Sequence, residues 1–189
     1  MTPTEILQRL KEGNKRFVSD RLDGKLQNSS RRENLTSGQD PYAIILSCAD
    51  SRVVPELAFD TGLGELFVVR VAGNIANTSS IASIEYAVAN IGSPIIVVMG
   101  HESCGAVTAA IKGGDNGYNL NHLLGQIYPA VIASEKNATI SDIVRKNAQL
   151  SVVELINRST IISDAVENDK LTIVSAYYHL DSGAVDFLD

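Results

Sequence analysis

Four short apolar runs constrain the fold of this chain more than any other feature of its sequence. Each run is rich in Val, Ile or Leu and lacks strict alternation of apolar and polar residues. Such runs are typical of strands that are buried on both faces, as in a parallel sheet. The predicted strands span residues 42–47, 66–71, 95–99 and 171–176.

The segments between these runs show the apolar pattern of helices. In residues 78–90, 122–134 and 141–158, apolar side chains recur three or four positions apart. Strands that alternate with helices predict an α/β domain with a mainly parallel central sheet flanked by helices. The 189 residues suit a single domain, 1–189, since domains commonly contain about 100–200 residues.

The N-terminal segment, residues 1–40, is predicted to be a helical arm of this domain. Thr2 can cap a helix, Pro3 suits its first position, and Glu5 completes a capping box. Residues 19–40 are polar and rich in helix-breaking positions. We therefore expect them to form a connecting segment with room for one helical turn.

The charge and the hydropathy of the chain argue against several classes of partner. The formal net charge is −6 and no basic cluster is present, which disfavours binding to nucleic acid or to anionic membranes. No apolar run approaches the roughly 20 residues that a membrane-spanning helix needs. The first ten residues lack the charged and then apolar pattern of a secretory signal, so we expect a cytoplasmic protein.

Cys48 and Cys104 are the two cysteines of the chain. A disulfide between them, or two unrelated buried thiols, is the ordinary interpretation. However, Cys48 directly follows the first predicted strand and His101 directly follows the third. Ligands gather beyond the carboxyl ends of strands in open α/β sheets, so these two residues should converge in space.

Cys104 lies three residues after His101 at a predicted helix start, where the helix N-terminus favours the thiolate. Thiolate and imidazole are ligand types that zinc prefers, and three protein ligands leave a fourth position open, as in catalytic sites. A lone His-x-x-Cys pair often arises by chance. Together with Cys48, it predicts one zinc ion per chain.

Asp50 and Arg52 follow Cys48 by two and four residues. At an ordinary surface they would form an ion pair of little energetic value. Beside a metal, Arg52 would keep Asp50 ionised and oriented, and Asp50 would accept a hydrogen bond from hydroxide on the zinc. Asp50 could instead bind the zinc and close the site. We predict that Asp50 and Arg52 are catalytic residues.

These segments resemble those of a known family. Residues 48–52 (Cys-Ala-Asp-Ser-Arg) and 101–104 (His-Glu-Ser-Cys) resemble the paired motifs of β-carbonic anhydrases. The resemblance implies the same three zinc ligands, the same Asp–Arg dyad, and an obligate homodimer that often pairs into a tetramer. It extends to nearly the whole chain and includes residues 13–17, 38–41, 67–74 and 83–88.

The resemblance also implies residues around the substrate. Gln39 resembles the glutamine that reaches the active site of a neighbouring subunit, and Phe67 and Tyr86 resemble pocket-lining residues. Val71 is a further candidate for the apolar wall that holds carbon dioxide. The backbone N–H of Gly105 is a candidate donor to the product oxygens.

Some members of the family have an inhibitory bicarbonate site that uses a Trp three residues before the first zinc-binding Cys. Ile45 occupies that position here, and the chain has no Trp. Arg70 is present, so this difference weakens the case for such a site without removing it.

The predicted activity is the reversible hydration of carbon dioxide to bicarbonate and a proton. Zinc lowers the pKa of its bound water toward about 7 in such enzymes. Because two thiolates neutralise the charge of the ion, we expect activity at neutral to alkaline pH. His122 and His179 are the remaining histidines, and neither is assigned as a proton shuttle.

Three alternatives stay open on the sequence. The same zinc could hydrolyse another small linear molecule, such as carbon disulfide. The fold could instead serve a non-catalytic zinc-binding or anion-binding protein, although the Asp50–Arg52 dyad argues against this. A nucleotide-binding protein is remote, because Gly62-Leu63-Gly64 precedes a predicted strand and lacks a phosphate-binding motif.

Overall fold

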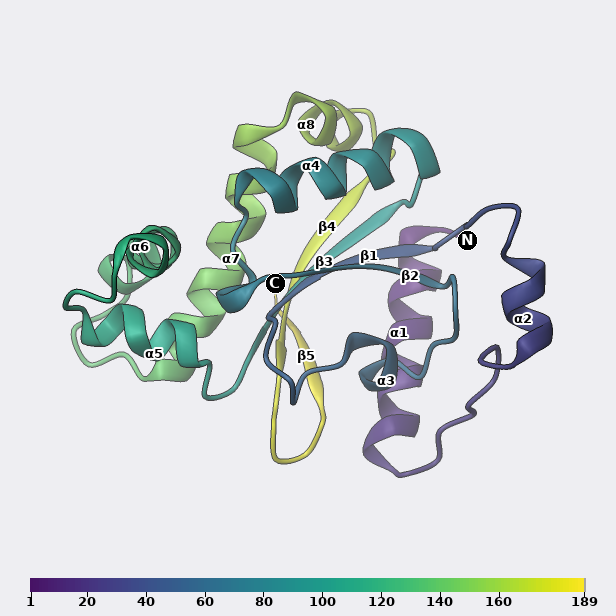
Figure 1. Ribbon diagram of the computed structural model, residues 1–189, viewed down its shortest axis with the longest axis horizontal. Coiled ribbons are helices and arrows are strands. Elements are labelled where there is room, and N and C mark those ends of the chain that lie inside the picture. Colours follow the sequence, from purple (N-terminus) through teal and green to yellow (C-terminus); the bar gives the residue numbers. More distant parts are fainter. Residues whose placement is uncertain (189) are drawn as a thin grey trace.

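The computed structural model describes residues 1–188 and arranges them around one five-stranded sheet (Figure 1). The strand order is β2-β1-β3-β4-β5, with parallel pairing from β2 to β4 and an antiparallel pair between β4 and β5. The predicted α/β fold with a mainly parallel sheet is confirmed. The strands are β1 (Ala43–Ser47), β2 (Leu66–Arg70), β3 (Ile95–His101), β4 (Thr172–Tyr178) and β5 (Val185–Leu188).

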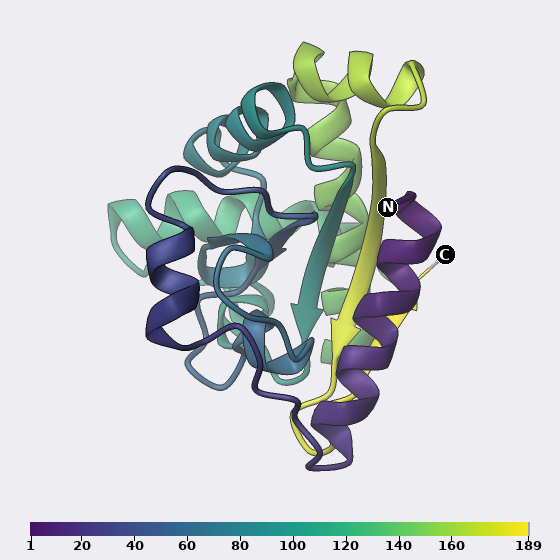
Figure 2. The ribbon, with the colours of Figure 1, turned by 90° about the vertical axis from the view of Figure 1, so that its right-hand side faces the viewer.

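Helices cover both faces of the sheet (Figure 2). α1 and α3 pack on one face, and α4, α7 and α8 pack on the other. None of the helices within residues 1–188 is both long and apolar enough to cross a bilayer. The α-helices are α1 (Pro3–Val18), α2 (Ser29–Asn34), α3 (Pro55–Ala58), α4 (Thr78–Tyr86), α5 (Gly105–Lys112), α6 (Tyr118–Ile132), α7 (Ile140–Arg158) and α8 (Thr160–Glu167), with a 3-10 turn η1 (Ala72–Asn74) and a π-helical turn η2 (Ala87–Ile91).

The burial of β1 explains why its sequence shows no alternation. Ile44 and Leu46 pack in the cluster beneath α4 and α7, whereas Ile45 packs in the cluster beneath α1. All three side chains are 0% exposed. Because helices cover both faces, an apolar residue is favoured at every position of this strand.

The predicted start of α1 is also confirmed. Thr2 caps the helix, Pro3 occupies its first turn, and Thr2 and Glu5 form the reciprocal bonds of a capping box. α2 provides the helical turn expected within residues 19–40.

The structure corrects the sequence prediction in three respects. His101 is the last residue of β3 rather than the residue after it. The helix predicted over residues 78–90 changes at Ala87 into the π-helical turn η2. The short elements α3, α8 and β5 are not predicted, because runs of four to eight residues hardly display a period.

Asn14 joins α1 to two distant parts of the chain. Its Nδ2 donates hydrogen bonds to the carbonyl oxygens of Ala58, at 2.9 Å, and of Gly183, at 2.8 Å. Its Oδ1 accepts a hydrogen bond from the N–H of Val185 at 2.9 Å. The residue is 7% exposed, so a buried amide with three backbone partners anchors α1 to α3 and to the β4–β5 connection.

The substitution Asn14→Ala should lower the free energy of unfolding by about 2–4 kcal/mol, because three buried backbone groups lose their partner. Urea unfolding followed by circular dichroism measures this change. Gln8→Ala, on the exposed side of the same helix, is the control and should change the free energy by less than about 0.5 kcal/mol. Equal effects of the two substitutions would contradict the anchoring role of Asn14.

Candidate metal centre

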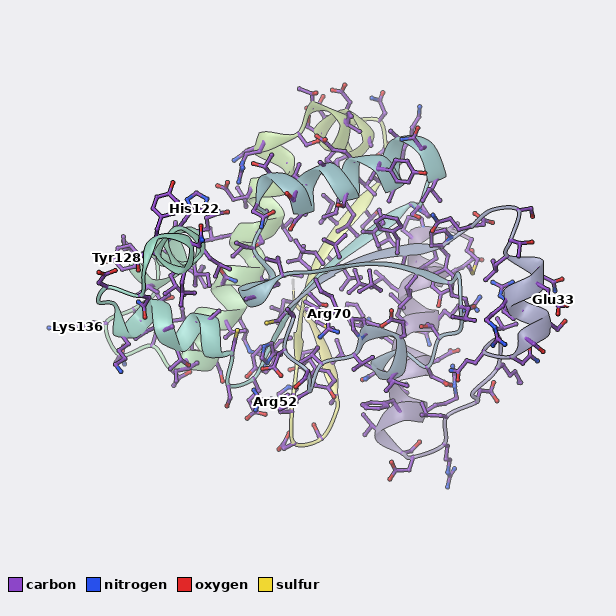
Figure 3. All side chains as sticks on the ribbon, in the orientation of Figure 1. Glu33, Arg52, Arg70, His122, Tyr128 and Lys136 are labelled. Atoms are coloured by element: carbon purple, nitrogen blue, oxygen red, sulfur yellow. The ribbon has the colours of Figure 1, made fainter. Side chains whose placement is uncertain are left out.

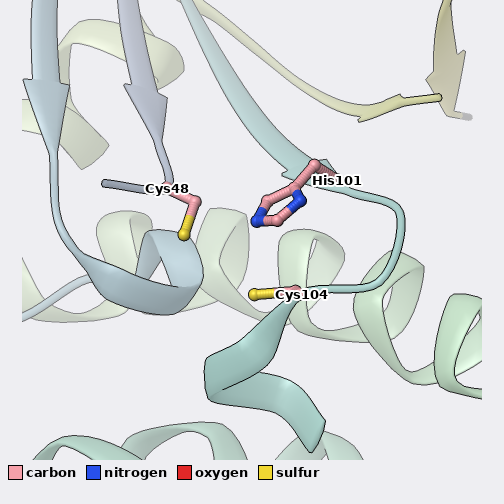
Figure 4. Close-up of side chains that lie close together, drawn as sticks. All are labelled: Cys48, His101 and Cys104. Atoms are coloured by element: carbon pink, nitrogen blue, oxygen red, sulfur yellow. The ribbon is translucent and has the colours of Figure 1, made fainter. Parts of the chain in front are cut away.

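Cys48, His101 and Cys104 converge at the carboxyl ends of β1 and β3 (Figure 4). Two sulfur atoms and one ring nitrogen lie within 4.8 Å of one another. The three residues are at most 4% exposed. Ligand sulfurs about 2.3 Å from a tetrahedral ion are roughly 3.8 Å apart, so the cluster needs little contraction to surround a metal ion.

His101 presents one ring nitrogen to this cluster. Its Nδ1 lies 2.8 Å from the carbonyl oxygen of Glu102, and a hydrogen bond donated there leaves Nε2 with its lone pair. Nε2 is buried and has no hydrogen-bond partner among residues 1–188. An unpaired buried acceptor costs free energy, and a bound metal ion would remove that cost.

A strained turn links His101 to Cys104. Ser103 has a φ of 52°, a left-handed conformation that costs a residue with a side chain about 1–2 kcal/mol. Cys104 then forms the N-cap of α5. The turn lets the imidazole and the thiol point toward the same space (Figure 4), so the strain coincides with the convergence of two ligands.

The two cysteines are free thiols rather than a disulfide. Hydrogen bonding with Cys104 lowers the pKa of Cys48, and the same interaction, together with burial, raises the pKa of Cys104. The two pKa values thus shift in opposite directions, so Cys48 loses its proton more readily than Cys104. A divalent cation bound to both sulfur atoms would balance the charge of two thiolates.

Asp50 and Arg52 form a two-pronged ion pair beside the cluster. Arg52 Nε and Nη2 donate to Asp50 Oδ1 and Oδ2 at 2.9 and 2.8 Å. These side-chain hydrogen bonds hold the pKa of the Asp50 carboxyl well below its usual range. Asp50 Oδ2 also lies 3.8 Å from His101 Nε2, so an ionised carboxylate stands next to the nitrogen that faces the cluster.

Arg70 and Gly73 hold the same loop, and neither role was predicted from the sequence. Arg70 Nε donates to the carbonyl oxygen of Cys48 at 3.0 Å, and its Nη2 donates to that of Asp50 at 2.6 Å. The N–H of Gly73 donates to Cys48 Sγ at 3.3 Å. The sequence signalled Gly73 only as part of the stretch that resembles the family, and it signalled Arg70 there and as a possible part of an inhibitory bicarbonate site. Bonds across 20 or more positions leave no local pattern.

Val71 and Gly105 lie near the cluster. The N–H of Val71 donates to the carbonyl oxygen of Ser47 at 3.1 Å, directly before Cys48, and its side chain packs on the apolar cluster that includes both cysteines. Gly105 follows Cys104 as the first residue of α5 and is exposed.

Gln39, Phe67 and Tyr86 do not lie at the metal cluster of their own chain. Phe67 pairs with Ile44, about 10 Å along β1 from its carboxyl end. Gln39 precedes β1 and is exposed, so it lies at the opposite end of that strand from Cys48. The rings of Phe67 and Tyr86 are 6.4 Å apart, and Tyr86 is 53% exposed.

The other two histidines are engaged elsewhere. Figure 3 shows His122 on α6 at one end of the molecule, well separated from Arg52 and Arg70. His179 Nε2 lies 2.8 Å from a carboxylate oxygen of Asp186. The structure therefore offers no reason to assign either histidine as a proton shuttle.

Comparison with known proteins identifies the relatives of this chain. A family model described as "Carbonic anhydrase" matches residues 43–185. "Carbonic anhydrase 2" of Mycobacterium tuberculosis is 38% identical over 187 residues, which cover 96% of this chain and 90% of that protein.

Two solved structures share the fold. The β-carbonic anhydrase CcaA is 26% identical, with a TM-score of 0.74 and coverage of 97% of this chain and 95% of that one. A tetrameric β-carbonic anhydrase of Sordaria macrospora is 23% identical, with a TM-score of 0.74 and coverage of 83% and 85%.

Substitution of the clustered residues should separate metal ligands from neighbours. We expect about one divalent metal ion per parent chain and, after Cys104→Ser, a large loss, because a thiolate ligand is removed. Asp50→Asn should retain the metal, since the three ligand atoms are unchanged. Elemental analysis of gel-filtered protein measures the metal content. Full occupancy after Cys104→Ser would show that the metal binds elsewhere.

Proposed function

This chain belongs to the β-carbonic anhydrase family, and we propose that it uses one zinc ion, held by Cys48, His101 and Cys104, to hydrate carbon dioxide reversibly. The observation that carries the proposal is the convergence of these three ligand atoms beside an ionised Asp50. Two buried cysteine sulfurs and an unpaired imidazole nitrogen fit zinc, which proteins commonly bind through sulfur and nitrogen ligands. When bound, zinc would act as a Lewis acid that lowers the pKa of a water molecule toward about 7.

Asp50 and Arg52 orient the reacting water in this proposal. Both carboxylate oxygens of Asp50 accept hydrogen bonds from Arg52, and Oδ2 also lies 3.8 Å from His101 Nε2. In the proposed site, the Asp50 carboxylate accepts a hydrogen bond from the reacting water. This bond would direct a lone pair of the water oxygen at carbon dioxide. Arg52 keeps the carboxylate ionised and fixed, because a guanidinium binds a carboxylate through two parallel bonds.

Val71 and Gly105 are proposed to hold the substrate and the product. Val71 offers an apolar wall next to Cys48, which suits a molecule without charge. The N–H of Gly105, at the N-terminus of α5, would donate to an oxygen that becomes negative as bicarbonate forms. The reaction of carbon dioxide with water yields bicarbonate and one proton, and both products leave the site.

A homodimer would complete this site. Gln39, Phe67 and Tyr86 lie away from the cluster of their own chain, which agrees with a role in the site of a neighbouring subunit. β2 is an edge strand with four half-buried apolar residues, and such edges are usually covered. We propose that a second copy covers this edge, and that dimers pair further, as the tetrameric relative does.

The chain is proposed to act as one zinc-dependent unit, residues 1–189, in the cytoplasm. Thiolate ligands remain reduced there, whereas oxidising compartments favour disulfides. Carbon dioxide hydration is favoured over hydrolysis of carbon disulfide and over a non-catalytic role, because the matched family model and the named relatives are carbonic anhydrases.

Stopped-flow hydration of carbon dioxide by protein of known zinc content tests the proposed reaction. The parent chain should be active at neutral to alkaline pH, and Cys48→Ser should lose both zinc and activity. Asp50→Ala should retain zinc but lose activity by roughly 10-fold to 100-fold, since the water loses its orienting acceptor. Full zinc occupancy without hydration between about pH 7 and 9 would refute the enzyme assignment.

Complementation between two inactive variants tests the shared site. Chains with Asp50→Ala and chains with Gln39→Ala, mixed and reassembled, should recover activity that neither has alone. In such a heterodimer, one site receives an intact Asp50 from one chain and an intact Gln39 from the other. A mixture of Asp50→Ala with Arg52→Ala is the control and should recover nothing. Failure of the first mixture despite exchange of subunits would place Gln39 outside the site.

A further inference from the structure

A chain of two hydrogen bonds connects α7 to Cys48. The N–H of Gly73 donates to Cys48 Sγ at 3.3 Å, and the carbonyl oxygen of Gly73 accepts from Asn147 Nδ2 at 2.8 Å. Both groups of this glycine are thus engaged, one by a sulfur of the metal cluster and one by a side chain 74 positions away. We propose that Asn147 is a positioning residue for the metal centre, which keeps the Gly73 N–H directed at Cys48.

The backbone conformation at residue 73 favours glycine. Its φ is 72° and its ψ is 16°, in the left-handed region that favours glycine. A Cβ atom at this position would lie 2.5 Å from Ile127 Cδ1. Ile127 of α6 therefore lies beside this turn, and Asn147 of α7 donates a hydrogen bond to it.

Asn147 is an unusual residue for its place. It lies in the middle of α7 at 2% exposure, and Ile143, Val144 and Ala148 are buried beside it on that helix. Asparagine has a low helix propensity, and a buried amide is costly unless it forms hydrogen bonds. The bond to Gly73 is the one that its side chain makes within residues 1–188, so this contact explains why an amide is present.

The bond from Gly73 bears on the chemistry of Cys48. An N–H that points at a thiolate withdraws electron density from the sulfur and fixes its direction. Groups that orient metal ligands in this way typically change metal affinity when they are removed. Asn147 acts indirectly, because it restrains the peptide group that follows Gly73 and does not contact the sulfur itself.

A purely structural role for Asn147 would have a different signature. If it only satisfied a buried carbonyl group, its loss would lower stability and leave the electronic properties of Cys48 unchanged. If it positions the Gly73 N–H, its loss would also alter the metal–sulfur bond. Readouts at the metal therefore discriminate between the two roles, and the inference rests on the proposed zinc site.

The test compares Asn147→Ala and Asn147→Leu with the parent chain and with Ser151→Ala. Both Asn147 variants lack the donor but differ in volume, so a common effect reports the hydrogen bond and not the packing. Ser151 is buried one turn further along α7 and forms no bond with Gly73, which makes it a matched control. Zinc affinity is measured by competition with a chromophoric chelator, and the sulfur-to-metal charge-transfer band is recorded after substitution with cobalt.

Both Asn147 variants should bind zinc roughly 10-fold to 100-fold more weakly and should shift the cobalt charge-transfer band to longer wavelength. Ser151→Ala should change the affinity by less than about 2-fold and leave the band in place. Unchanged affinity and spectrum in either folded Asn147 variant would overturn the inference. Absence of zinc binding at Cys48 in the parent chain would instead overturn the proposed function.

Discussion

The parallel pairing of β1 with β3 is the constraint on which the site depends. Ser47 pairs with Met99 in this register, so Cys48 and His101 emerge from adjacent strands at the same edge of the sheet. A shift of one residue would direct the side chains to opposite faces, because side chains alternate along a strand. The fully buried apolar residues of both strands resist such a shift. Packing in the core thus determines the geometry at its edge.

Several otherwise unfavourable features gather at that edge. They include an unpaired buried imidazole nitrogen on His101, a left-handed Ser103 and two buried cysteines whose pKa values shift in opposite directions. The unpaired nitrogen and the strained turn cost free energy in the metal-free chain, and binding of a cation to the sulfur and nitrogen atoms would offset these costs. Until a metal binds, contacts elsewhere in the fold, such as those of Asn14, offset the free-energy cost of these features.

The parts that could be predicted from the sequence are those that local patterns encode. Buried parallel strands leave continuous apolar runs, a capping box marks the start of α1, and residues that follow strand ends share an edge. The edge strand β5 has four residues and pairs antiparallel with β4, so its identity depends on a tertiary contact. The bonds of Arg70 and Asn147 also escape prediction, because their partners lie 20 to 74 positions away.

The positions of Phe67 and Tyr86 support the proposal that a second chain completes the pocket at the metal cluster. The ligands, Asp50 and Arg52 belong to loops held by β1, β3 and α5, and these loops already form close mutual contacts. A pocket for a small neutral molecule also needs apolar side chains on the side of the cluster that faces solvent. Phe67 and Tyr86 do not supply them within one chain, because they lie away from its cluster. In the proposed dimer, such side chains from one copy would reach the open side of the other. The same contact would cover the apolar edge strand β2, so assembly would protect the sheet and enclose the substrate in one step.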